Sequence, residues 1–161
     1  MHGDRERPNA SHVRSASAAG PAVEDHGRAI TANRVGAAFY RQAQQAADTS
    51  DAISALRQAV TADPAFGVAI ADLDAITETT PAPGGIGGRQ MNWERHHIEV
   101  VRTAAAGNHG RASDLLREHL ASVGCDPLAL RIVIELRVRG GHREGLDDLW
   151  GNVPGCHQVW T

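Results

Sequence analysis

The sequence contains no lysine, so all sixteen of its basic residues are arginine. Together with abundant alanine and glycine, this composition is typical of a GC-rich genome and predicts an actinobacterial source. Residues 1–34 carry five arginines against four acids, residues 35–80 carry two against six, and residues 81–161 carry nine of each. A nucleic-acid surface needs a concentrated basic face, and no segment offers one. We therefore expect no nucleic-acid partner.

Aromatic residues, cysteines and long apolar runs are also scarce. Only 4% of the residues are aromatic, which suits close helix–helix packing better than a thick β-sandwich core. The two cysteines, Cys125 and Cys156, are too few for a disulfide scaffold, and we expect both to be free thiols. The sequence contains no run of about 18 apolar residues, so it predicts no membrane span. The charged N-terminus lacks the apolar region of a secretory signal. These absences favour a reduced, cytoplasmic protein without a membrane partner.

The chain divides by composition into a tail, a helical domain and a second tail. Residues 1–23 are rich in Ser, Ala, Gly, Pro and Arg and are expected to be disordered. Residues 24–150 are expected to form one helical domain, and residues 151–161 an irregular C-terminal tail. Within the domain, residues 79–90 hold two prolines and two Gly-Gly pairs and predict a flexible linker.

Apolar spacing within the domain is helical throughout, and no segment alternates with period two for long. We therefore predict an all-α fold without a sheet. Asp63-Pro64 and Asp126-Pro127 are typical helix starts, with Asp at the cap and Pro at the first position. Asn92 is a further expected cap. The expected helices cover 24–47, 52–61, 64–77, 92–106, 110–122, the segment from Pro127 to about 139, and 142–150.

Two segments show the residue pattern of a helical repeat. In the first, Ala52, Leu56, Ala59 and Pro64 have the spacing of a second-helix alanine, a large apolar residue, another alanine and a terminal proline. The alanines let two antiparallel helices approach closely. The second segment matches less fully. Its corner glycine, Gly107, is followed by Ala112 and Leu116 at the expected offsets, but His119 replaces the second small residue and Pro127 comes three residues late.

Residues 50–140 resemble the tetratricopeptide repeat protein 38 family. The resemblance rests on DPAFGVAIADLDAI, WERHHIEVVRTAAAGNHGRASDLLREHL and DPLALRI, and ERHHIE followed by AAGN is its most specific part. It implies a short α-solenoid of about three antiparallel helix pairs, and it carries over no biochemical activity. This chain is shorter than the family's chains, and Phe39 and Tyr40 stand near the first corner where a small residue is usual.

Two adjacent histidines raise the possibility of a metal site. On a helical wheel, His97 falls on the apolar face, His96 at its edge and Glu94 on the inner side. Glu94 and His97 could supply one Glu-x-x-His ligand pair of a carboxylate-bridged metal site, although no second such pair occurs. The alternative is a packing histidine, with a ring nitrogen bonded to a backbone or carboxylate group. We favour packing, so no metal or other cofactor is expected.

The pattern as a whole favours a non-catalytic protein-interaction module. Solenoids bind protein or peptide partners on a concave surface, which here would include Tyr40, Arg41, His96 and Arg131. The last helix, with Leu146 and Trp150, could mediate self-association. The alternatives are a small metal-binding protein or metal-dependent enzyme using Glu94 and His97, and an accessory subunit of an enzyme complex.

Overall fold

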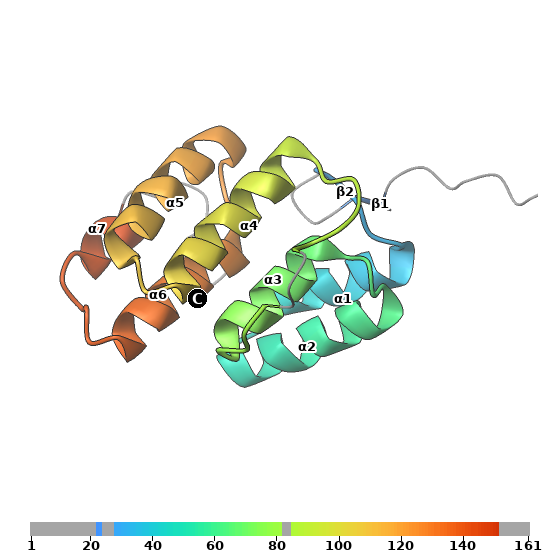
Figure 1. Cartoon of the computed structure of the whole chain (residues 1–161), viewed down its shortest axis with the longest axis horizontal. Coiled ribbons are helices and arrows are strands. Elements are labelled where there is room, and N and C mark those ends of the chain that lie inside the picture. The colour runs from blue at the N-terminus through green and yellow to red at the C-terminus, as the bar shows by residue number, and fades with distance from the viewer. Residues whose placement is uncertain (1–21, 24–27, 82–84, 152–161) are drawn as a thin grey trace, which may run out of the picture.

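A computed structural model describes residues 22–23, 28–81 and 85–151 of the chain. These residues form seven helices and one short strand pair (Figure 1). The predicted all-α fold is confirmed, apart from the strand pair. The elements are β1 (Ala22–Val23), β2 (Ala29–Ile30), α1 (Arg34–Gln45), α2 (Thr49–Ala62), α3 (Gly67–Ile76), α4 (Asn92–Ala105), α5 (His109–Val123), α6 (Pro127–Arg139) and α7 (Leu146–Gly151).

The helix boundaries follow from capping side chains and glycines. At four N-termini a side chain accepts a hydrogen bond from a backbone N–H of the first turn, which supplies a partner that the helix itself cannot provide. At the corner between α4 and α5, Gly107 has φ +80°, and Gly124 ends α5 with φ +86°. Glycine adopts this left-handed conformation at little cost. The four capping residues are Asn33, Asp48, Asn108 and Asp126.

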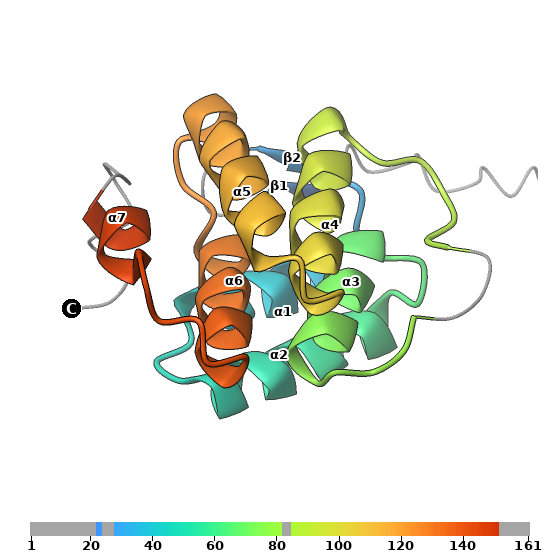
Figure 2. The same ribbon diagram turned by 60° about the vertical axis from the view of Figure 1, so that its left-hand side comes forward.

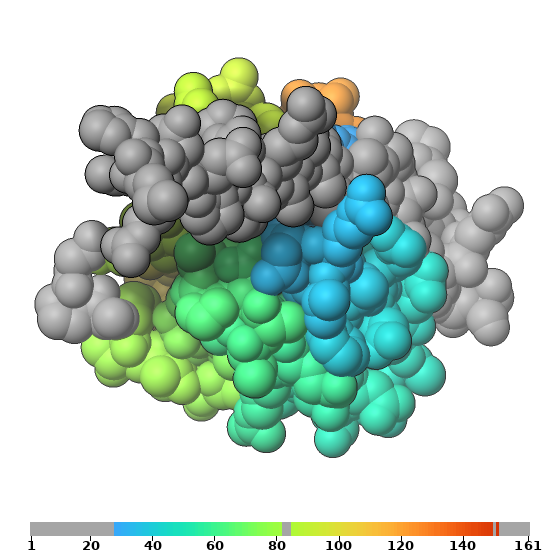
Figure 3. Space-filling model, turned by 90° about the vertical axis from the view of Figure 1, so that its right-hand side faces the viewer, coloured from blue at the N-terminus to red at the C-terminus, as the bar shows by residue number. Residues whose placement is uncertain are grey.

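The first helical hairpin, α1 and α2, packs through small side chains. Ala52, Leu56 and Ala59 of α2 are completely buried, as the repeat pattern predicts. Ala37 and Ala43 of α1 are buried as well. Because alanine has almost no side chain, the two helices lie close together, and α3 packs beside α2. Figure 3 shows this face of the molecule in space-filling form, with α1 in blue beside the green region of α2 and α3.

We call α1 to α3 the first part of the molecule and α4 to α6 the second part. Helix α4 lies at the centre of the second part. It packs against α3, α5 and α6, and α6 also contacts α1 (Figure 2). The fully buried apolar side chains at these contacts are Val100, Val101, Leu116, Leu128, Ile132 and Val133. The two parts therefore share one continuous core.

The N-terminal part of the domain departs from the prediction. A helix was expected over 24–47, but α1 begins at Arg34 and is preceded by an antiparallel pair in which Ala22 faces Ile30 and Val23 faces Ala29. This segment is held by α4: the Trp93 indole donates to the Ala29 carbonyl at 2.8 Å. These tertiary contacts outweigh the local helix preference.

Two other helix starts are also displaced from their predicted positions. Helix α3 begins at Gly67 and not at Pro64, and the Asp63 carboxylate accepts from the backbone N–H groups of Asn33 and Ala65. Helix α4 is capped at Met91 and not at Asn92. The Glu94 carboxylate accepts from the Met91 N–H at 2.7 Å.

The tails lie largely outside the described residues, which include neither 1–21 nor 152–161. Val23 was assigned to the disordered tail but belongs to β1. No helix forms in the described parts of the predicted linker, 79–81 and 85–90. Within the described residues, no helix is both long enough and apolar enough to cross a bilayer. Cys125 is disulfide-bonded, so the prediction of a free thiol there is wrong. The two cysteines therefore no longer support the prediction of a reduced, cytoplasmic protein.

Candidate functional site

A chain of hydrogen-bonded polar side chains runs through the core of the molecule, from α1 to α5. The imidazole of His97 lies between two carboxylates: its Nε2 is 2.6 Å from Asp72 Oδ1, and its Nδ1 is 2.7 Å from Asp126 Oδ2. His119 Nε2 is 2.8 Å from the same Asp126 oxygen. At the other end, the Tyr40 hydroxyl donates to Asp72 Oδ2 at 3.1 Å. We call these five residues the Asp–His cluster.

Each member of the Asp–His cluster comes from a different part of the chain. Tyr40 lies on α1, Asp72 on α3, His97 on α4 and His119 on α5, while Asp126 is the N-cap of α6. The second Asp126 oxygen, Oδ1, accepts from the Ala129 N–H at 3.1 Å. All five side chains are completely buried. The cluster therefore joins five helices at one point in the interior.

The two carboxylates stabilise a positive charge on His97. Burial alone lowers the pKa of an imidazole, but the neighbouring Asp126 and Asp72 carboxylates outweigh this effect and raise the pKa of His97 to about 10. The same attraction acts in return on Asp126. Burial raises the pKa of that carboxyl, yet His97 and the hydrogen bond from His119 bring it well below its usual value. His97 is therefore an imidazolium at neutral pH.

The outer members of the cluster respond mainly to burial. Burial raises the pKa of Asp72 and raises that of Tyr40 well above 10.0, with the Asp72 charge adding to the effect on Tyr40. Burial lowers the pKa of His119 more than Asp126 raises it, so His119 is neutral at pH 7. One imidazolium, one neutral imidazole and at least one carboxylate thus share a region without solvent.

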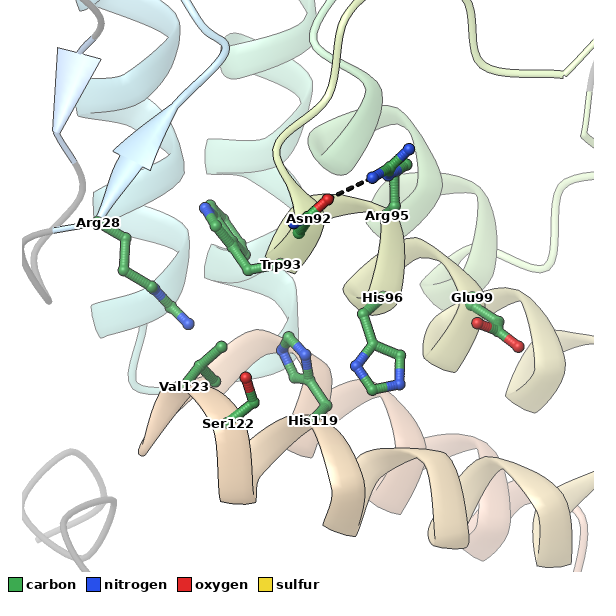
Figure 4. A pocket seen from close by; sticks show the side chains of 9 residues that line it. All are labelled: Arg28, Asn92, Trp93, Arg95, His96, Glu99, His119, Ser122 and Val123. Atoms are coloured by element: carbon green, nitrogen blue, oxygen red, sulfur yellow. Dashed lines mark hydrogen bonds between the residues drawn. The ribbon is translucent and has the colours of Figure 1, made fainter.

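Above the His119 end of the cluster, the surface is hollowed between the start of α4 and the end of α5. The hollow has a volume of about 740 Å³. Figure 4 shows His96 from α4 and His119 from α5 pointing toward each other across it, with their ring centroids 5.3 Å apart, and Arg28 reaching in from the start of β2. The lining residues are Arg28, Asn92, Trp93, Arg95, His96, Glu99, His119, Ser122 and Val123.

The alternative interpretation of Glu94 and His97 as a pair of metal ligands does not match the structure. Both residues are buried, as the helical wheel predicts. However, the Glu94 oxygens accept from the Thr31 hydroxyl and backbone N–H at 2.8 to 2.9 Å and from the Met91 N–H, which ties the β2 segment to α4. Among the described residues, the His/Cys/Asp/Glu group with metal-ligand spacing is His97, His119 and Asp126. Glu94 is a helix cap, and the interpretation of His97 as a packing residue bonded to a carboxylate agrees with its contacts.

The four residues expected on a concave binding surface lie in different places. Tyr40 is completely buried and packs edge-on against Phe66, so its assignment to a binding surface is wrong. Arg131 is 6% exposed and donates to the Ala46 carbonyl, at the wall of a second hollow of about 470 Å³ between α2 and α6. Arg41 is half-buried and lines neither hollow. His96 alone lines the larger hollow.

Three cluster members were not predicted as site residues. Asp126 was expected only as a helix cap, and no role was predicted for Asp72. His119 carried a signal, since it replaces a small residue of the repeat pattern. The position of Pro127, three residues later than the repeat pattern expects, is a second signal in the sequence. It places Asp126 where its carboxylate reaches both His97 and His119.

Comparison with known protein families, with curated proteins and with solved structures finds no match to this chain. The resemblance to tetratricopeptide repeat proteins therefore stays a prediction from the sequence.

Proposed function

We propose that this chain is a non-catalytic protein-interaction module, a short tetratricopeptide-like array that binds an acidic polypeptide segment in the hollow between α4 and α5. The observation that supports the proposal is the hollow itself. Its volume of about 740 Å³ lies within the range of about 300–1,000 Å³ typical of ligand-binding pockets. It can receive a few side chains of a bound peptide.

The lining of the hollow favours an acidic ligand. Arg28, Arg95 and His96 line it against the single carboxylate of Glu99. The Arg28 guanidinium lies 4.4 Å from the centroid of the Trp93 ring, a cation–π arrangement that holds its positive charge beside the hollow. Guanidinium groups bind carboxylates through paired hydrogen bonds. Carboxylate-bearing segments therefore gain most from this site.

Self-association through α7 is a weaker proposal. Leu149 of α7 is 2% exposed and Leu146 is half-buried, so both already pack within the chain. Among the described residues, the large apolar side chain that stands exposed is Val35, on α1. The hollow is the better candidate surface.

Binding of fluorescein-labelled acidic, neutral and basic peptides, followed by fluorescence anisotropy, tests the proposal. We expect the acidic set to bind best and the Arg95→Glu variant to lose that binding. Arg117→Glu is the matched control, because Arg117 is an exposed arginine of α5 outside the hollow. Equal binding of all three peptide sets, or an equal loss in the Arg117→Glu variant, would refute the proposal.

A further inference from the structure

Asp126 Oδ2 lies between two imidazole nitrogens deep inside the protein. It is 2.7 Å from His97 Nδ1 and 2.8 Å from His119 Nε2. A neutral imidazole has one N–H and can donate to one acceptor only, yet His97 is flanked by carboxylates on both sides. When both carboxylates are ionised, the contact between His97 Nδ1 and Asp126 therefore requires a cation, which can be a second proton or a metal ion.

We propose that His97 Nδ1, His119 Nε2 and Asp126 Oδ2 form a binding site for a divalent transition-metal ion, with Zn²⁺ as the best fit. The three side chains offer ligand atoms that all lie within 4.8 Å of one another. Two imidazoles and one carboxylate are a common ligand set for zinc. The set shares His97 with the pair suggested by the sequence and replaces Glu94 with residues from two other helices.

The neighbours of these ligands have the arrangement that metal sites require around them. Metal-binding histidines almost always donate their other ring N–H to a carboxylate or carbonyl, and His97 Nε2 is 2.6 Å from Asp72. Asp72 is itself held by the Tyr40 hydroxyl. Asp126 is oriented through its other oxygen by the Ala129 N–H. Two of the three ligands are thus aligned by independent hydrogen bonds.

His119 supplies a separate observation. Its Nδ1 is buried and has no hydrogen-bond partner among the described residues. No second contact therefore determines which ring nitrogen carries the proton, and Nε2 is able to present its lone pair to a metal.

The hollow provides the entry path and the remaining coordination position. His119 belongs both to the ligand set and to the lining of the hollow. Zinc–nitrogen distances of about 2.0–2.1 Å in tetrahedral geometry require each imidazole nitrogen to move roughly half an ångström further from Asp126 Oδ2 than its present 2.7 or 2.8 Å. A tetrahedral ion would then take its fourth ligand, a water molecule, from the side of the hollow.

The test is a titration of the full-length chain, purified without a histidine tag and freed of metal with a chelator. Zn²⁺ is followed by calorimetry and Co²⁺ by its visible absorption, which reports tetrahedral coordination. We expect one ion per chain. His119→Gln should abolish this binding, and Asp72→Asn, which replaces the carboxylate behind His97 with a neutral amide, should weaken it about 10- to 100-fold.

His109→Gln is the matched control, since His109 pairs with His142, with ring centroids 4.9 Å apart, away from the ligand set. This variant should bind zinc as the wild type does. Wild-type protein that binds no more zinc than His119→Gln, or an equal loss in His109→Gln, would overturn the proposal. If His119→Gln does not fold, Asp72→Asn decides: unchanged zinc affinity would overturn the proposal as well. Arg95→Glu should leave zinc binding intact, which separates this test from that of peptide binding.

Discussion

The two helical hairpins of this chain use the same framework with opposite interiors. In α2, the inward positions Ala52, Leu56 and Ala59 are all apolar. In α5, the corresponding positions are Ala112, Leu116 and His119, and all three are equally buried. In the first hairpin, the last of these positions is the methyl group of Ala59. In the second hairpin, it is the imidazole of His119, which is hydrogen-bonded to the carboxylate of Asp126.

The difference shows which part of the molecule is built for packing alone. Alanine brings two helices together without further requirements. A buried imidazole and carboxylate lose their hydration and stay stable only when every partner is in place, and apolar residues of similar volume often stabilise a protein as well or better. Stability alone therefore does not account for a charged interior in the second part. It also lies directly below the hollow, which favours a binding role.

The largest expected effect comes from removing the cap of α6. Asp126→Ala deletes the N-cap and also leaves His97 and His119 buried without their shared acceptor, so we expect a loss of about 3–5 kcal/mol in the free energy of unfolding. The matched change in the first hairpin is Asp48→Ala, which removes an exposed cap and should cost about 1 kcal/mol. Urea denaturation of both variants measures the difference. Equal losses would show that Asp126 acts only as a cap.

Exchanging the residues at the equivalent positions gives the next largest effect. Ala59→His places an imidazole in an apolar seam without a partner and should cost about 2–3 kcal/mol, through overpacking and an unsatisfied polar group. His119→Ala gives α5 the alanine that α2 has at position 59 but removes a partner of Asp126, and should cost about 1–3 kcal/mol. Thermal unfolding of each variant checks both values. A stabilised His119→Ala variant would contradict the account of the cluster.

The pH dependence of the free energy of unfolding tests the contribution of the buried His97 in the wild-type protein. The pKa of His97 is raised from 6.5 to about 10 in the folded state, so the folded protein binds more protons than the unfolded chain between these values. Its contribution is complete below pH 6.5 and is lost as the pH rises toward 10.

The groups facing His97 do not cancel this trend. The raised pKa values of Asp72 and Tyr40 also favour the folded state at the lower pH, while the lowered pKa values of Asp126 and His119 act below pH 3.8 and below pH 6.5. Urea denaturation in the presence of a chelator should show stability falling from pH 7 to pH 10 in the wild type. His97→Gln should lack this fall, and a slope of the same size in that variant would assign it to other groups.

The smallest effect is expected for a pair of oppositely charged side chains at the surface. Arg117 and Asp114 form an ion pair at 2.9 Å, with side chains 49% and 62% exposed. Solvent screens such a pair, so Arg117→Ala should change stability by about 0.5 kcal/mol or less. A loss approaching that of Asp126→Ala in urea denaturation would remove the contrast between buried and exposed charges.

The predictability of each part from the sequence follows the same division. The inward alanines of α2 and the burial of Glu94 and His97 follow from helical periodicity, which shows the face of a helix that turns inward. Periodicity does not show which side chain will lie opposite. His97 meets Asp72 and Asp126 across 25 and 29 residues of sequence, and only the packing of α3, α4 and α6 brings them together. The strand pair before α1 was missed for a related reason, since its contacts with α4 lie more than 60 residues away in sequence.

The ring nitrogens of His97 carry the central claim, that one imidazolium held between two carboxylates joins the helices of the second part. Imidazole ¹⁵N chemical shifts of the metal-free protein at pH 8 measure their protonation directly. We expect both nitrogens of His97 to be protonated and His119 to be neutral. A neutral His97 with a single N–H at that pH would contradict the account, because the proton of one of its two contacts would then belong to the carboxyl group and no imidazolium would be present.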